Sequence, residues 1–248
     1  MNKMTLGLVA ASLTASTAAF AQNEDVTQDS RYSFVQASYI PYQNLDTEYG
    51  DEDADGVNIN AAWHFVEQAY VFGHGDFTDL DDGTDYTTYA LGLGLRGPLG
   101  DTRPGVADAG EVDIYLEIGY EGFELESSGN IGGQSLDAKL DGEGYGVNIG
   151  LRWLATEALE INPFVGYVNY GEPDIELRAG NDTLAGSANE DLDGLRYGLR
   201  SVLDLSHSLA ATLAFERNQL DIGGLDIDTN TVRVGLRWYL PARGFSVR

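Results

Sequence analysis

Four arginines follow a Gly-Leu step in this 248-residue sequence, at Arg96, Arg152, Arg200 and Arg237. Two of these repeats read Gly-Leu-Arg-Trp, and all four lie in stretches that are otherwise mostly apolar. A guanidinium stays charged at neutral pH, so it is tolerated away from water only beside a carboxylate or other acceptors. The repeats therefore indicate ion-pair chemistry inside the protein.

Four glutamates are the candidate partners, namely Glu117, Glu121, Glu160 and Glu216. In antiparallel pairing, Glu160 lies across a short turn from Arg152, and Glu216 lies one diagonal step from Arg200. A glycine two residues before each arginine is expected to leave room for the guanidinium on the same face. These eight residues predict a charge network that fills an interior, lines a narrow pore or cradles a ligand.

His74 and Asp76 are the candidate pair for acid–base chemistry. They share one face of a segment over residues 69–78, near its outer end, where such a pair could activate water. No second aspartate pair can be assigned beside them. We therefore expect that the protein is not an enzyme.

The run Asp51 to Gly56 places carboxylates and a glycine as in an EF-hand loop, but the twelfth position is Ala62 instead of glutamate. A true EF-hand is excluded, and we assign no metal site and no cofactor. Divalent cations that associate loosely with the acidic loops remain an expected partner.

Alternating apolar and polar residues organise the segments that carry these groups. Val57, Ile59, Ala61, Trp63 and Phe65 share one face, whereas the other face is polar, as in a β-strand. Six segments show this pattern clearly and four show it weakly: residues 57–65, 87–96, 112–121, 145–153, 195–205 and 232–240, then 31–42, 69–78, 158–170 and 208–220. The pattern predicts an all-β, closed antiparallel barrel of about ten strands, or eight if two weak segments are loops.

The second face of these strands is rich in Gly, Asn, Arg and Glu, which suits the lumen of a barrel whose apolar face meets lipid. Aromatic residues near strand ends fit the interfacial girdles of such a barrel: Trp63, Phe65, Trp153, Tyr167, Trp238 and Tyr239. The alternative is a soluble periplasmic ligand-binding barrel, whose apolar faces would point inward.

The connections alternate in length. Residues 66–68, 155–157 and 206–208 form short links, whereas residues 44–56, 79–85, 127–144, 171–194 and 221–229 form longer links rich in Gly and Asp. Short turns on one rim and long loops on the other are typical of outer-membrane barrels. We expect five acidic loops outside and both termini in the periplasm. The long link over residues 97–110 is an exception on the short-turn side.

Composition sets the class of protein. Residues 1–21 are expected to be a signal peptide that ends in Ala19-Phe20-Ala21, which leaves residues 22–248 as one domain. The formal net charge of −26 and the scarcity of lysine exclude nucleic acid as a partner. There is no cysteine, so burial and backbone pairing alone must stabilise the domain.

The stretch Arg233 to Leu240, RVGLRWYL, is similar to the assembly signal of outer-membrane barrels in its polar Arg233, Gly235, aromatic Trp238 and hydrophobic Leu240. With the strand pattern, the chain resembles the Gram-negative outer-membrane β-barrel superfamily, either small OmpA/OmpX-type domains or porin-like barrels. It departs from them in the tail PARGFSVR, since typical members end on an aromatic residue.

The resemblance implies a location in the cell outer membrane, contact with membrane lipid and lipopolysaccharide, and insertion by the barrel-assembly machinery with chaperones as transient partners. We expect a structural or surface protein, or a narrow porin-like channel. The alternatives are an outer-membrane enzyme similar to the omptin proteases and the soluble periplasmic barrel.

Overall fold

The computed structural model describes residues 30–47, 50–81, 83–100, 109–131, 134–180 and 182–240. The expected signal peptide and the tail after Leu240 lie outside these residues. The described chain contains one 3-10 helix and twelve strands: η1 (Ser30–Tyr32), β1 (Phe34–Thr47), β2 (Gly50–Val66), β3 (Ala69–Leu80), β4 (Asp85–Pro98), β5 (Val112–Ile131), β6 (Gln134–Leu154), β7 (Leu159–Asn169), β8 (Asp174–Ala179), β9 (Asp182–Ser187), β10 (Asp193–Ser206), β11 (Leu209–Ile222) and β12 (Leu225–Tyr239). None of the described residues forms a helix of the length and apolar character that crossing a membrane requires.

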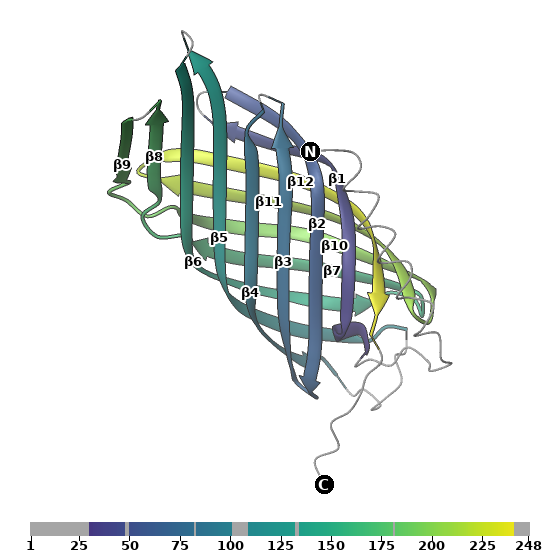
Figure 1. Ribbon diagram of the computed structural model, residues 1–248. Helices are drawn as coiled ribbons and strands as arrows, with labels where there is room; N and C mark the ends of the chain where they lie inside the picture. The colour runs from purple at the N-terminus through teal and green to yellow at the C-terminus, as the bar shows by residue number, and fades with distance from the viewer. Residues whose placement is uncertain are drawn as a thin grey trace.

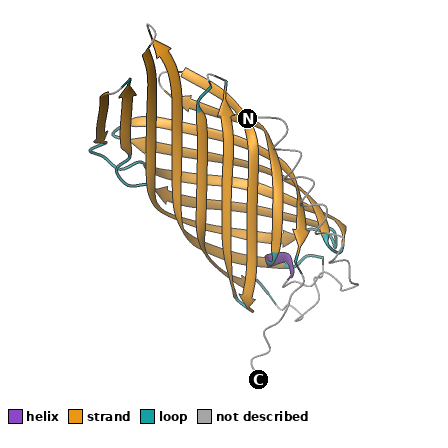
Figure 2. Cartoon of the chain, viewed as in Figure 1, coloured by secondary structure: helices purple, strands orange, loops and turns teal. Residues whose placement is uncertain are grey.

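Ten of the strands close into an antiparallel barrel. The hydrogen-bonded order runs β5-β4-β3-β2-β1-β12-β11-β10-β7-β6, and pairing of β5 with β6 closes the ring. Figures 1 and 2 show the strands strongly tilted around a central axis, as closure of a barrel requires. The prediction of a ten-stranded closed barrel is confirmed, and the eight-stranded alternative is wrong.

The remaining two strands extend one end of the barrel. β6 pairs with β7 along its second half and with β8 along its first half, and β9 pairs with β8. We call this extension the distal sheet, defined as residues 124–131 of β5, residues 134–141 of β6, β8 and β9. The barrel end that carries it is the distal end.

Four of the five predicted long loops are largely strands, among them residues 221–229, which pair within β11 and β12 except for Gly223 and Gly224. Residues 127–144 continue the β5–β6 ladder, and residues 171–194 contain β8 and β9. The prediction of loops was wrong because backbone pairing between strands extends through these acidic, glycine-rich residues. Residues 44–56 likewise continue the β1–β2 pairing to Thr47 and Gly50.

The opposite, proximal end carries the short turns. Glu67 and Gln68, residues 155–158, and His207 and Ser208 connect consecutive strands there. Figure 2 shows η1 at this same end, away from β8 and β9.

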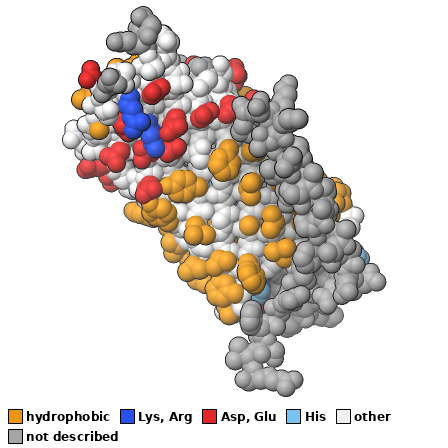
Figure 3. Space-filling model, viewed as in Figure 1, with side chains coloured by type: hydrophobic (Ala, Val, Ile, Leu, Met, Phe, Trp, Pro, Cys, Tyr) orange, Lys and Arg blue, Asp and Glu red, His pale blue; other side chains and the backbone are white. Residues whose placement is uncertain are grey.

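Strand alternation places apolar side chains on the outside of the barrel. Leu91, Ile149 and Val234 are 69%, 46% and 49% exposed, whereas polar neighbours such as Asn148 are buried. Figure 3 shows an orange apolar band over the middle of the barrel and acidic side chains gathered at the distal end. Such a surface is unfavourable in water and matches a hydrocarbon solvent.

Aromatic side chains bound this band on both sides. The tryptophans lie toward the proximal end, and a distal set consists mostly of exposed tyrosines: Tyr39, Tyr42, Phe77, Tyr89, Tyr120, Tyr145, Tyr197 and Phe215. From Tyr145 to Trp153, β6 rises about 26 Å at 3.3 Å per residue. At a tilt of about 40° this corresponds to roughly 20 Å along the axis, close to the apolar height of outer-membrane barrels. The prediction that Tyr239 belongs to an interfacial girdle is wrong, because its side chain is buried and faces the lumen.

Candidate functional site in the barrel lumen

A cluster of buried ion pairs crosses the distal half of the lumen. Arg196 of β10 pairs with Glu121 of β5, and Arg233 of β12 pairs with Asp76 of β3 and, at 3.1 Å, with Glu216 of β11. Asn58 donates a hydrogen bond of 2.7 Å to Asp76. The Arg196–Glu121 and Arg233–Asp76 pairs each join strands three positions apart around the ring of ten, so these side chains reach across part of the lumen. We call Asp76, Glu121, Arg196, Glu216 and Arg233 the distal cluster.

Apolar side chains close the lumen beyond the distal cluster. Phe123, Val168, Tyr170, Leu192 and Leu220 are all buried against one another. The rings of Phe123 and Tyr170 meet edge to face at 4.9 Å. These five residues form the distal cap, and they separate the distal cluster from the solvent at that end.

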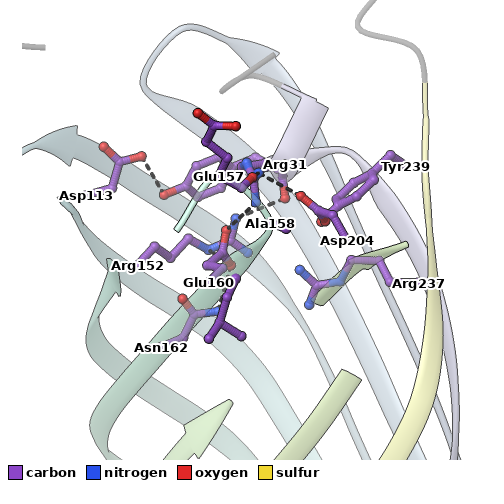
Figure 4. A network of polar contacts seen from close by, with 12 residues as sticks. Arg31, Asp113, Arg152, Glu157, Ala158, Glu160, Asn162, Asp204, Arg237 and Tyr239 are labelled. Atoms are coloured by element: carbon purple, nitrogen blue, oxygen red, sulfur yellow. Dashed lines mark hydrogen bonds and ion pairs between the residues drawn. The ribbon is translucent and has the colours of Figure 1, made fainter. Parts of the chain in front are cut away.

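A second cluster fills the proximal mouth (Figure 4). Arg31 of η1 lies 2.8 Å from a carboxylate oxygen of Asp204 and 3.4 Å from Glu160. Arg152 donates a hydrogen bond of 2.9 Å to the backbone carbonyl of Arg31. Tyr239 donates to Asp204 at 2.8 Å. The charged groups thus hold η1 in the mouth of the barrel.

Tyr32, the last residue of η1, completes this proximal cluster. Its hydroxyl donates to Asp113 at 3.0 Å, and the guanidiniums of Arg96 and Arg152 lie 4.5 Å and 3.9 Å from its ring centroid. Cation–π attraction of this kind strengthens when the groups are removed from water. The ring of Tyr32 therefore occupies the proximal mouth, and its contacts with the two arginines hold it there.

Small cavities lie between and beside the two clusters. The middle of the lumen holds a cavity of about 60 Å³ lined by Glu117, Asn148, Asn162, Arg200 and Arg237, among others. Cavities of about 20 Å³ lie beside the distal cluster and beside Arg31. About 10–15 Å³ of such space holds one water, so the middle cavity has room for several waters and each smaller cavity for about one.

All eight residues of the predicted charge network face this lumen, but only some of them contact the partners that were predicted. Arg152 and Arg200 each lie 3.9 Å from their predicted partners, Glu160 and Glu216. Glu121 instead pairs with Arg196, and Glu117 accepts a hydrogen bond from Tyr70 at 2.9 Å.

Arg96 and Arg237 take partners other than the predicted glutamates. Arg96 lies 3.4 Å from Asp113. Arg237 donates to the side-chain oxygen of Gln36 at 3.0 Å and 3.1 Å, and its guanidinium lies 3.9 Å from the ring centroid of Phe34. Within the described residues, no carboxylate lies within ion-pair distance of Arg237.

The glycines that precede the arginines were predicted to make room for guanidiniums, but other side chains lie over them. A Cβ at Gly94 would meet the ring of Tyr70, one at Gly150 the ring of Tyr115, and one at Gly198 the ring of Phe164. Tyr70 is also the direct cross-strand partner of Gly94. The expectation that these glycines make room for guanidiniums is wrong, because aromatic rings from neighbouring strands occupy the space.

Several lumen residues were not predicted from the sequence. Arg196 and Asp204 share the inward parity of Arg200, and Asp113 shares that of Glu117, so strand parity could have found them. Arg31 lies in the segment 31–42 that was predicted as a strand, but β1 begins at Phe34 and Arg31 belongs to η1 instead. Arg233, which belongs to the predicted assembly signal, contributes its guanidinium to the distal cluster.

The rest of the predicted assembly signal lies on β12 and just after it. A Cβ at Gly235 would meet Ser38 of β1, and the backbone N–H of Leu240 donates to Ser33. Trp238 is half-buried, with the outward parity of β12. These positions are compatible with a structural role at the seam between β1 and β12, and the assembly role stays a prediction.

His74 and Asp76 lie inside the lumen rather than at its rim. His74 lines the middle cavity, and the Asp76 carboxylate is held by Arg233 and Asn58. The prediction of an outer-end position was wrong, since β3 continues to Leu80 and the distal cap lies beyond. Asp51 to Gly56 belongs to strand β2 rather than to a cation-binding loop, and none of the described residues forms a metal-binding group of three or more.

No protein-family model and no curated protein sequence matches the chain. Among solved structures, the chain is similar to the outer membrane protease OmpT from Escherichia coli, with a TM-score of 0.51 at 10% identity over 89% of this chain and 100% of that chain. Weaker similarity is found to the attachment invasion locus protein Ail of Yersinia pestis, with a TM-score of 0.39 at 12% identity, over 83% of this chain and 97% of that one. The similarity to OmpT is one of fold, a closed antiparallel β-barrel.

Proposed function

We propose that this chain is an integral outer-membrane barrel with a closed lumen, which presents its distal sheet at the cell surface as a structural or interaction protein. The apolar band and its aromatic borders support the membrane location, because roughly 20 Å of exposed leucine, isoleucine and aromatic surface would aggregate in water. On this proposal the proximal end faces the periplasm.

One observation carries the choice of a closed barrel over a porin-like channel. The distal cluster spans the lumen with side chains that are paired and buried, and the distal cap seals it from solvent. Removal of one partner from a buried ion pair costs about 3–5 kcal/mol. Thermal opening of several such pairs at once is therefore rare.

The distribution of histidine supports the expectation that the protein is not an enzyme of the omptin kind. The chain contains three histidines. His64 and His207 lie near the proximal end, and His74 lies below the distal cap. A protease active at the distal rim would need an accessible base there.

The remaining partners follow from this location. We propose membrane lipid and lipopolysaccharide as the surroundings of the apolar band, and the barrel-assembly machinery as a transient partner during insertion. Divalent cations would screen the acidic distal surface without a dedicated site.

Planar-bilayer recording of the purified protein tests the closed lumen. Heat-modifiable migration on a gel first establishes that the barrel has folded, so that electrical silence reflects closure. We expect no steady conductance from the wild-type protein. A steady wild-type conductance that changes in an Arg152→Ala variant would overturn the proposal in favour of a pore.

A further inference from the structure

The edge of the distal sheet is unprotected. Among the described residues, β9 pairs with β8 and with no other strand, and all six of its side chains are exposed. The pairing is regular, and β9 contains neither proline nor lysine. Natural sheets block such an edge with proline, charged side chains or a bulge, because free backbone groups recruit another strand; in β9 the one charged residue is Asp182, at its first position.

The side of this sheet that continues the lumen-facing parity is apolar. Ile175 and Leu177 of β8 are 41% and 39% exposed, and Leu184 of β9 is 70% exposed. Leu177 and Leu184 are direct cross-strand partners, so they form one continuous patch. The distal sheet lies beyond the tyrosine border of the apolar band, so lipid tails do not cover this patch.

The charge of the distal sheet selects the kind of partner. Residues 124–131, 134–141, 171–180 and 182–191 contain ten acidic residues and two basic ones. Lys139 is already surrounded by Glu124, Glu126 and Asp141, and Arg178 by Glu176. Nearby, the hydrogen bond between Asp46 and Asp51 raises the pKa of Asp46, as expected where carboxylates crowd together. This field repels a second copy of the chain and anionic lipid headgroups, and attracts cations.

We propose that β9 binds an extended cationic peptide segment of a partner protein by strand addition. The partner's backbone would pair with the open edge of β9, its apolar side chains would cover Leu184 and Leu177, and its basic side chains would meet the acidic surroundings. Strand addition obtains affinity from main-chain hydrogen bonds and specificity from alternate side chains. This inference rests on the proposed outward exposure of the distal sheet.

The other open edge of the same sheet serves as an internal comparison. Residues 127–129 of β5 extend beyond the pairing with β4, which ends at Glu126. Their sequence is Ser-Ser-Gly, so these three positions offer no apolar side chain. The proposal therefore assigns the partner to β9 rather than to β5.

The test uses the full-length mature protein in neutral detergent and a fluorescent, end-blocked octapeptide of alternating lysine and valine. Fluorescence anisotropy reports binding. A glutamate–valine octapeptide tests charge, and the lysine–valine octapeptide N-methylated at four central residues tests backbone pairing. We expect the first peptide to bind, the glutamate peptide not to bind, and the methylated peptide to bind at least tenfold more weakly.

Two matched variants locate the site. Leu184→Lys on β9 should weaken binding of the lysine–valine peptide at least tenfold, whereas Ser128→Lys on β5 makes the same charge change at the other edge and should weaken it less than threefold. Both positions are exposed, so both variants should fold.

Equal binding of the methylated peptide, equal loss in the two variants, no binding at all, or concentration-dependent dimerisation through β9 would each overturn the inference. Conductance of the same preparation is read separately. A conducting barrel that binds the peptide contradicts only the closed lumen, and a silent barrel that does not bind contradicts only the strand-addition site.

Discussion

At the residue scale, two kinds of contact recur in the lumen. Aromatic rings lie over glycines of neighbouring strands, and arginine guanidiniums stack on aromatic rings. Phe164 lies over Gly198, its cross-strand partner, and the guanidinium of Arg200 lies 4.4 Å from the centroid of the Phe164 ring. The Gly-Leu-Arg repeat thus places a space for a ring two residues before a cation that stacks on a ring. Aromatic rings that cover strand glycines are a recognised way to stabilise sheets.

The first prediction concerns one of these glycines. Gly94→Ala should lower the free energy of unfolding by about 1–3 kcal/mol, because the new methyl group would overlap the ring of Tyr70 and force overpacking. Urea titration in lipid vesicles measures this. Gly97→Ala is the matched control on the same strand, since nothing lies within 4 Å of its Cβ position. An equal effect of the two substitutions would contradict the proposed packing.

A second prediction concerns the buried charges. Arg233→Ala should lower the free energy of unfolding by about 3–5 kcal/mol, because Asp76 and Glu216 would lose their shared cation inside the lumen. Arg178→Ala is the control, since its pair with Glu176 is exposed to solvent and is expected to contribute little to stability. The same urea titration compares them, and similar small losses would show that the distal cluster is hydrated.

At the scale of the elements, the sequence predicted the barrel strands because their alternation is strict where lipid and lumen differ most. It failed for β8, β9 and the first half of β6. Their acidic and glycine-rich composition is typical of loops, and a strand that has water on both sides needs no strict alternation. The sequence also did not predict which strands pair, because β6 has both β7 and β8 as neighbours on one edge.

The same limits apply to the candidate site. Strand parity predicted which residues face inward, and two ion pairs followed from turn geometry. Arg31 and the ring of Tyr32 did not follow, because they enter the lumen from a 3-10 helix outside the repeating pattern. The Arg196–Glu121 pair joins β10 and β5, which are three positions apart around the closed ring, so no local register predicts it.

The third prediction is that the distal hairpin is dispensable for the barrel. Replacement of residues 174–187 with a short Gly-Ser linker removes β8 and β9, which pair only with each other and with the distal half of β6. We expect the shortened protein to keep heat-modifiable migration and a urea midpoint close to that of the full protein. Loss of folding would show that the hairpin stabilises closure.

At the scale of the whole molecule, charge is segregated along the barrel axis. The clusters and the middle of the lumen contain equal numbers of cations and carboxylates: Arg31, Arg96, Arg152, Arg196, Arg200, Arg233 and Arg237 with Asp76, Asp113, Glu117, Glu121, Glu160, Asp204 and Glu216. The excess of acidic side chains in the described chain therefore lies outside the two clusters, and Figure 3 shows acidic side chains gathered at the distal end. A neutral interior, an apolar band and an acidic end together give the molecule a defined orientation.

Thiol labelling on intact cells tests the proposed orientation most directly, because the chain has no cysteine and each introduced thiol is unique. Thr183→Cys lies on β9, and His207→Cys lies in a proximal turn; both positions are exposed. With a bulky, membrane-impermeant maleimide, we expect Thr183→Cys to be labelled on intact cells and His207→Cys only after the outer membrane is permeabilised. Labelling of both on intact cells, or of His207→Cys alone, would contradict the account.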